Sequence, residues 1–334
     1  MSGPLFTLRD VTLPGSHTPR LKFVTLAIPV GATAVVGLSG AGKTSLLNVL
    51  AGFETAFSGD LKMLVSSDKK DRLPVYWVPQ NGGLWPHLSV EQHLDVVNAE
   101  VPQNSNSRTE SGRFSKRTDE LLSLFDLNHR RQALPAELSQ GERSRLALAR
   151  ALATRANVLL LDEPLSHVDP VRKPAYWKIV RQVVAEENVS MVFTSHEPET
   201  VLRHAENVIC LEAGAVAFEG SVRTLYDNPP NRQVGEFLGP LNWFARDEVA
   251  TFLVDQAGDA DVAIRPERLL IELLADSPIE FELQLFAGLY SESIVRHTAS
   301  GATMSVLHQS QISQTMKHGD RVTLRMRPHA GANS

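Results

Sequence analysis

The sequence predicts an α/β fold built around a parallel sheet, followed by a small domain of short strands. Three observations support this prediction. Several short apolar runs end in polar side chains, a glycine-rich segment stands between a strand pattern and a helix pattern, and the C-terminal part changes to short strands separated by turns. Uninterrupted apolar runs are typical of parallel strands buried on both faces. Regularly spaced short strands are typical of small sheets and barrels.

The glycine-rich segment is GLSGAGKT, which fits the phosphate-loop pattern G-x-x-x-x-G-K-[ST]. A strand pattern (33–36) precedes it and a helix pattern (45–51) follows it. The loop is therefore expected at a helix N-terminus, where backbone N–H groups and the helix dipole favour phosphate. Lys43 is expected to contact the β- and γ-phosphates, and the Thr44 hydroxyl to bind Mg²⁺. The residues predicted to surround the nucleotide phosphates are Gly37, Leu38, Ser39, Gly40, Ala41, Gly42, Lys43, Thr44 and Ser45.

Polar side chains follow three further strand patterns. Asp162 and Glu163 follow the run NVLLL, His196 follows MVFTS, and Gln80 follows VYWVP. Because ligands bind at the carboxyl ends of parallel strands, these side chains are expected beside the phosphate loop. Asp162 is a predicted Mg²⁺ ligand, and Gln80 is predicted to contact Mg²⁺ or the attacking water. Glu163 is predicted to polarise that water as the catalytic base, with His196 holding it near the γ-phosphate.

A second motif, LSQGE at 138–142, is specific to one family. Together with the phosphate loop, Gln80, LLLLDEP, the segment LSHVD at 165–169 and His196, all in the same order, it makes the chain resemble ATP-binding-cassette (ABC) transporter ATPase subunits over roughly residues 4–238. The resemblance implies a Mg²⁺-dependent ATPase in which two head-to-tail subunits share two ATP sites. In that family the signature binds the γ-phosphate of ATP held by the other subunit, and here it comprises Leu138, Ser139, Gln140, Gly141 and Glu142. Asp169 resembles the residue that links the two sites across the dimer.

The chain departs from the family pattern at several positions. Gln140 stands where the signature usually has glycine, and Glu142 where it usually has glutamine. The largest departure lies upstream of the phosphate loop, where the family usually stacks an aromatic residue on the adenine. The segment LPGS at 13–16 occupies that place. Two substitutes stay open, which are His17 and an apolar face at Leu13 that packs against the purine.

Composition bounds the class of protein. The 334 residues are enough for two domains. A net charge of −5 argues against a nucleic-acid-binding protein, which usually carries a basic surface. No segment approaches the ~20 apolar residues of a membrane span, and the N-terminal residues do not resemble a signal peptide. The single cysteine, Cys210, lies in an apolar stretch and is predicted to be a small core residue. These features predict a cytosolic protein whose partner supplies any membrane.

The predicted fold is a P-loop ABC ATPase core, with an antiparallel β subdomain and a helical subdomain, followed by a small OB-like β-barrel. The ATPase domain is expected over residues 1–237, with the helical subdomain at about 83–150, and the barrel over 238–334. The run AIRPE at 263–267 resembles part of the C-terminal (TOBE-like) barrel of importer ATPases. Two roles stay open for this domain, which are regulation of the ATPase and dimerisation alone. In the family the helical lobe grips a membrane partner through a groove that includes Trp85, although Trp85 is equally typical of a core aromatic.

The function that the resemblance implies is that of the ATP-hydrolysing subunit of an importer. It would energise uptake of a small solute (ion, oxyanion, polyamine or sugar) with ATP and Mg²⁺ as cofactors. Expected partners are a second copy of the chain, transmembrane permease subunits and an extracytoplasmic solute-binding protein, but no nucleic acid. The expected location is peripheral, on the cytoplasmic face of the inner or plasma membrane. Two alternatives stay open: a soluble ABC ATPase without a transport partner, and a weakly catalytic regulatory subunit, suggested by Gln140 and the missing aromatic.

Overall fold

The computed structural model describes residues 3–55, 57–65, 72–98, 116–253, 259–309 and 316–327. The chain divides into two compact units, Met1–Val222 and Arg223–Ser334. The first unit contains a six-stranded sheet whose strands are all parallel except the last, which is antiparallel at one edge. In spatial order these strands are β5 (Val75–Val78), β6 (Val158–Leu161), β7 (Ser190–Thr194), β3 (Ala32–Val36), β8 (Asn207–Glu212) and β9 (Ala215–Ser221). Strands β3, β6 and β7 are buried along their whole length, as their uninterrupted apolar runs predict.

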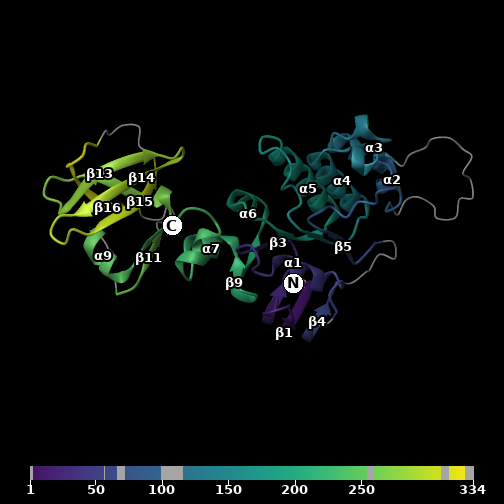
Figure 1. Cartoon of the computed structure of the whole chain (residues 1–334), viewed down its shortest axis with the longest axis horizontal. Helices are drawn as coiled ribbons and strands as arrows, with labels where there is room; N and C mark the ends of the chain where they lie inside the picture. The colour runs from purple at the N-terminus through teal and green to yellow at the C-terminus, as the bar shows by residue number, and fades with distance from the viewer. Residues whose placement is uncertain are drawn as a thin grey trace, which may run out of the picture. The chain divides into compact units, whose positions relative to one another are not determined.

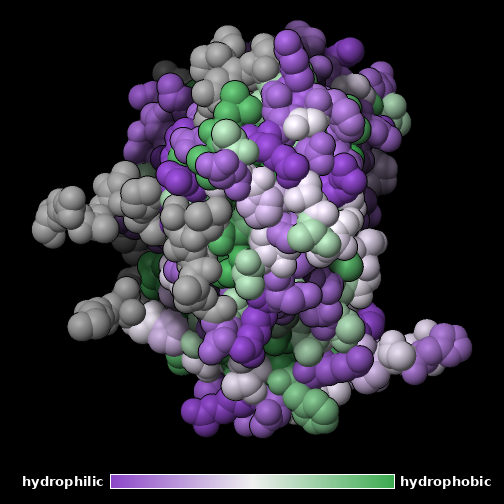
Figure 2. Space-filling model, turned by 90° about the vertical axis from the view of Figure 1, so that its left-hand side faces the viewer, coloured by the Kyte–Doolittle hydropathy of each residue, from purple (hydrophilic) through white to green (hydrophobic). Residues whose placement is uncertain are grey.

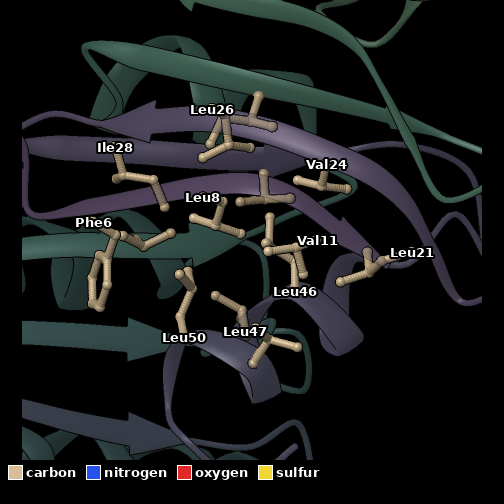
Figure 3. Close-up of a cluster of buried hydrophobic side chains, with 14 of the residues drawn as sticks. Phe6, Leu8, Val11, Leu21, Val24, Leu26, Ile28, Leu46, Leu47 and Leu50 are labelled. Atoms are coloured by element: carbon tan, nitrogen blue, oxygen red, sulfur yellow. The ribbon is translucent and has the colours of Figure 1, made fainter. Parts of the chain in front are cut away.

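A smaller antiparallel sheet lies over the helix that follows the glycine-rich loop. Its spatial order is β2 (Leu21–Ile28), β1 (Phe6–Leu13) and β4 (Ser58–Met63). Buried and exposed residues alternate along much of β1 and β2, as expected when one face of a sheet is covered. Figure 3 shows that the covered face, which includes Leu8 and Val24, packs on Leu46, Leu47 and Leu50 of α1 (Lys43–Leu50). This packing holds the start of α1 next to the β1–β2 turn.

Two of the remaining helices of the first unit begin at a serine whose side chain caps the helix. The Ser89 hydroxyl and the Gln92 side chain form a reciprocal capping box at the start of α2. Ser139 caps α4 in the same way. The helices, coloured blue to teal-green in Figure 1, are α2 (Val90–Asp95), α3 (Lys116–Leu124), α4 (Gln140–Ala153), α5 (Lys173–Glu187) and α6 (Pro198–His204), with short 3₁₀ turns at Asn128–Arg130 and Pro135–Glu137.

The second unit is a small β domain. Its five-stranded antiparallel sheet has the spatial order β12 (Leu269–Leu273), β16 (Arg321–Met326), β13 (Ile279–Phe286), β14 (Tyr290–His297) and β15 (Thr303–Gln309). The edge strands β12 and β15 also approach each other, as in a small barrel. The other elements are α7 (Val222–Asp227), α8 (Arg232–Glu236), β10 (Asn242–Phe244), α9 (Arg246–Phe252), β11 (Val262–Ile264) and a 3₁₀ turn, Pro266–Arg268. On the face in Figure 2, hydrophobic side chains form small patches between hydrophilic ones.

The two units meet at residues 222/223, just before the segment 226–242 where the sequence suggested a linker, so that segment belongs to the second unit. Arg265 gives the reason. Its buried guanidinium donates hydrogen bonds to the carbonyl oxygens of Tyr226, Gly235 and Gly239. The segment that contains α7 and α8 is therefore tied to the β domain. This network also accounts for the arginine in the AIRPE run, because a guanidinium can satisfy several buried carbonyl groups at once.

No helix in the described part of the chain is long and apolar enough to cross a membrane.

Candidate nucleotide site

The glycine-rich loop joins β3 to α1 in a backbone conformation that requires glycine. Gly37 and Gly42 have φ angles of +151° and +106°, which other residues adopt only with strain. A Cβ on Gly37 would collide with the carbonyl oxygen of Leu211, and one on Gly42 would lie 2.7 Å from the carbonyl oxygen of Arg20. Neighbouring backbone thus requires glycine at two of the positions predicted to surround phosphate.

The loop ends in two polar side chains, Lys43 and Thr44, which bond to different parts of the first unit. The Lys43 ammonium donates hydrogen bonds to the carbonyl oxygens of Gly37 (2.8 Å) and Leu38 (3.0 Å), so it lies across the mouth of the loop. The Thr44 hydroxyl donates to Oδ2 of Asp162 at 2.7 Å, although 118 residues separate them in the sequence. The structure therefore brings together the two predicted oxygen ligands of Mg²⁺, from the start of α1 and the end of β6.

Thr194, at the end of β7, organises the two carboxylates that follow β6. Its fully buried hydroxyl donates to Oδ1 of Asp162 at 2.6 Å and accepts the backbone N–H of Glu163 at 2.8 Å. Sequence reasoning passed over this residue because a threonine in a strand is usually unremarkable. The available signal was its position, because a hydroxyl-bearing residue at the carboxyl end of a strand beside β6 faces the same edge as Asp162.

Glu163 stands between the two other predicted catalytic side chains. Its Oε2 accepts a 3.4 Å hydrogen bond from Nε2 of Gln80, and its Oε1 lies 3.3 Å from Nδ1 of His196. Its backbone has a φ of +47°, a conformation that costs a non-glycine residue about 1–3 kcal/mol. Gln80, Glu163 and Asp162 also line one cleft of about 270 Å³. The predicted cluster at the carboxyl ends of β5, β6 and β7 is therefore present.

The signature segment forms the N-terminus of α4. The Ser139 hydroxyl accepts the N–H of Glu142, and the Glu142 carboxylate accepts the N–H of Ser139 (2.8 Å) and a bond from Nε of Arg130 (3.1 Å). Burial alone would raise the pKa of Glu142, but these hydrogen bonds outweigh it and lower the pKa to about 2. A Cβ on Gly141 would lie 3.3 Å from the carbonyl oxygen of His167. Ser139 and Gln140 are exposed, so this helix start is accessible to a ligand.

Arg150, in the last turn of α4, holds the backbone that follows Gln80. Its buried guanidinium donates to the carbonyl oxygens of Gly82 and Gly83, both at 2.8 Å, and lies 4.6 Å from the ring centre of Trp85. Burial lowers the pKa of Arg150. Trp85 itself is half-buried, so it both packs on Arg150 and faces outward. Sequence reasoning missed Arg150 because nothing in the sequence distinguishes it from the other arginines of α4.

Trp85 and Arg150 also line a groove of about 400 Å³ on the first unit. The most exposed aromatic side chain of this groove is Phe53, 69% exposed, whose ring packs on Trp77 with the ring centres 4.6 Å apart. The full lining, called here the aromatic groove, is Ala51, Phe53, Val75, Tyr76, Trp77, Pro79, Gly83, Trp85 and Arg150.

Comparison with known proteins agrees with this geometry. A family model described as "ABC transporter" matches residues 21–166. The Fe(3+) ions import ATP-binding protein FbpC of Yersinia pestis bv. Antiqua (strain Antiqua) is 31% identical over 313 residues, covering 86% of this chain and 87% of the relative. The chain belongs to the ABC transporter family. It is therefore an ABC-type ATPase, as its motifs predicted.

Two further matches are also ATP-binding proteins. The spermidine/putrescine import ATP-binding protein PotA of Roseobacter denitrificans is 30% identical, with 84% of each chain covered. The chain is also similar to the solved structure of an ATP-binding-cassette dimer in a post-hydrolysis state bound to ADP and Pi. That match has a TM-score of 0.54 and 26% identity, and covers 65% of this chain and 99% of the other. The predicted P-loop ABC ATPase fold is confirmed.

The sequence offered two residues, Leu13 and His17, as partners for the base of the nucleotide, and only one of them is exposed. Leu13 is fully buried in the core, so the prediction that an apolar face at Leu13 packs the purine is wrong. The physical reason is the strand alternation of β1, which turns Leu13 toward the same buried side as Val11. His17 is exposed in the β1–β2 turn and stays a candidate.

Proposed function

We propose that this ABC ATPase is the energising subunit of a membrane importer for a small solute. The observation that carries the proposal is the aromatic groove. Arg150 lines this groove and also donates a hydrogen bond to the carbonyl oxygen of Gly83, in the loop that follows Gln80. An apolar surface rimmed by polar groups is typical of a protein-docking site. Its attachment to a catalytic loop supplies a physical route from a docked partner to the ATPase cycle.

The proposed hydrolytic mechanism follows from the cluster around Glu163. Mg²⁺ fits the site, because Thr44 and Asp162 present hydroxyl and carboxylate oxygens within 2.7 Å of each other, and oxygen ligands are those Mg²⁺ prefers. When bound there with ATP, the ion neutralises phosphate charge. Glu163 polarises the attacking water, and His196 and Gln80 hold that water in line with the γ-phosphate. Lys43 binds the β- and γ-phosphate oxygens.

The second half of each site would come from another copy of the chain. Ser139 and the N–H groups at the start of α4 form an accessible anion site at a helix N-terminus. We propose that it binds the γ-phosphate of ATP held by the partner copy, and that exposed Asp169 links the two sites. Glu142 does not oppose this role, because its charge is already neutralised by Arg130 and turned toward the backbone of Ser139.

The importer assignment is supported by relatives of which two match 84–86% of the chain, so that their match extends into its β domain. Their names include import of ferric iron and of spermidine/putrescine, and a third relative, from Shewanella oneidensis, is a sulfate/thiosulfate import protein 34% identical over 225 residues. The solutes in these names share the class of small ions and polyamines. We propose that the partners of this chain are transmembrane permease subunits and a solute-binding protein outside. We propose a peripheral location on the cytoplasmic face of the membrane. We also propose a regulatory or dimerising role for the TOBE-like domain predicted at 238–334, which makes up most of the second unit.

The test is reconstitution with the permease. Full-length protein is co-purified with its integral membrane partner, placed in proteoliposomes, and assayed for ATP-dependent uptake of ferric iron, spermidine, sulfate and maltose. We expect uptake of one solute class, abolished by Glu163→Gln, and a weakened complex with Phe53→Ser. Val30→Ser is the matched control, because Val30 is also an exposed apolar residue but does not line the aromatic groove. Brisk ATPase activity without any membrane partner would favour the soluble alternative, and negligible activity with the partner would favour the regulatory one.

A further inference from the structure

The β1–β2 turn lies against the phosphate loop, and Arg20 is its point of contact. The carbonyl oxygen of Arg20 is 2.7 Å from the position of a Cβ on Gly42, the residue that precedes α1, and 2.9 Å from that of a Cβ on Gly214. The next residue, Leu21, points into the core between this sheet and α1 (Figure 3). A nucleotide whose phosphates occupy the loop therefore has the Arg20 segment as an immediate neighbour for its sugar and base.

The Arg20 side chain is held in one position on this turn. Its Nε donates to the carbonyl oxygen of Pro14 (3.1 Å), and its Nη1 pairs with Oε1 of Glu54 at 2.7 Å. A Cβ on Gly15 would lie 3.2 Å from Cγ of Arg20 and would also collide with the carbonyl oxygen of Thr18. Gly15 therefore leaves the space in which the arginine stem lies. The Arg20 side chain remains 43% exposed, so part of its surface is available to a ligand.

A guanidinium in this state has the properties needed to bind a purine face. It is planar and delocalised, more weakly hydrated than an ammonium, and stacks on aromatic rings. The two hydrogen bonds orient it in advance, which reduces the entropy lost when a base binds. Residues 14–23, all of which the structure describes, carry three exposed planar side chains, His17, Arg20 and Phe23. Arg20 is distinguished by its backbone contact with the phosphate loop and by its tethered side chain.

We propose that Arg20 is the base-binding residue of this site, and that its guanidinium stacks on the adenine of the bound nucleotide. It takes the place of the aromatic side chain that the segment at 13–16 lacks. The proposal rests on nucleotide binding by the phosphate loop and is independent of the import function.

The experiment separates base binding from phosphate binding. Calorimetry on the full-length protein measures the Kd of ADP and of pyrophosphate, which has no base. We expect Arg20→Ala to weaken ADP binding about tenfold, equivalent to roughly 1.4 kcal/mol, with pyrophosphate binding unchanged. Arg20→Lys keeps the charge but not the planar face, and should resemble Arg20→Ala. Arg20→Tyr restores a planar face and should retain most of the ADP affinity.

Two matched variants, His17→Ala and Phe23→Ala, remove the other exposed planar groups of the same segment and should leave ADP affinity near wild type. Equal weakening of ADP and pyrophosphate in Arg20→Ala, with rescue by lysine, would show that Arg20 acts by charge and would overturn the stacking proposal. Loss of ADP affinity in His17→Ala or Phe23→Ala, with Arg20→Ala unaffected, would overturn it as well. Failure of the wild type to bind either ligand would instead contradict the assignment of the phosphate loop.

Discussion

Thr194 offers the sharpest test of how the catalytic edge is held, through the substitution Thr194→Val. Valine keeps the β-branched shape but removes the hydroxyl, which donates to Asp162 and accepts from the backbone N–H of Glu163. Because Thr194 is fully buried, water cannot replace either bond. The variant therefore leaves one buried carboxylate oxygen and the partly buried N–H of Glu163 without their partner.

The magnitude follows from the two bonds. A hydrogen bond to a charged group contributes about 1.5–3 kcal/mol and a neutral one about 0.5–1.5 kcal/mol, so the pair amounts to roughly 2–4.5 kcal/mol. Glu163 also has a left-handed backbone, at φ +47°, and the Thr194 hydroxyl helps to hold it there. Without that bond we expect the carboxylate to move away from the attacking water. Because small misplacements of a catalytic group can reduce rates by about 10²-fold, kcat should fall by about 10- to 100-fold.

The assay is steady-state ATP hydrolysis by the purified full-length protein, with thermal unfolding measured in parallel. We expect a lower kcat with little change in the KM for ATP, because Lys43 and the loop backbone are untouched. Thr194→Ser is the matched control, since serine retains the hydroxyl and should recover most of the rate. If the valine variant kept both the wild-type kcat and the wild-type unfolding temperature, the reasoning about Thr194 would be refuted.

Three further outcomes are expected. Glu163→Gln should bind ATP with near wild-type affinity but hydrolyse it about 10²- to 10⁴-fold more slowly, the usual contribution of a general base; normal turnover in a phosphate-release assay would assign the base elsewhere. The pKa of Glu142 is lowered from 4.5 to about 2, so its charge stabilises the fold above pH 4.5, and this contribution is lost as the pH falls toward 2. The difference in unfolding temperature between wild type and Glu142→Gln should therefore shrink from pH 6 to pH 3. A constant difference would contradict this prediction. Cys210 is buried and its pKa is raised to about 12, so a thiol reagent should label it only after denaturation, and rapid labelling of native protein would show that β8 is open to solvent.

The sequence predicted the parts of the site that lie at the carboxyl ends of parallel strands. Apolar runs ending in Gln80, Asp162 or His196 define parallel strands whose ends meet, so residues far apart in the sequence could be placed together. The capping boxes of Ser89 and Ser139 were similarly readable, because each depends on residues three positions apart.

What the sequence did not reveal depends on tertiary contacts. The role of Thr194 requires knowing that β7 pairs with β6, and that of Arg150 requires knowing that the end of α4 meets the backbone of Gly82 and Gly83. The attachment of residues 226–240 to Arg265 was hidden for the same reason, because the carbonyl groups that this arginine binds lie 25 to 39 residues earlier in the chain.

Arg150 has a consequence for the timing of the ATPase cycle. Helix α4 spans 14 residues, about 21 Å at 1.5 Å per residue, with the signature at its first turn and Arg150 in its last. A partner protein that docks in the aromatic groove and rotates α4 would therefore move the signature at the start of the helix. At the other end of the helix it would move the backbone next to Gln80, through Arg150. Because the signature and Arg150 lie on the same helix, we expect the two movements to occur in the same step. If the partner docks in the aromatic groove as proposed, a compound bound there would arrest turnover while leaving the ATP contacts free, and it would compete with the partner protein and not with the nucleotide.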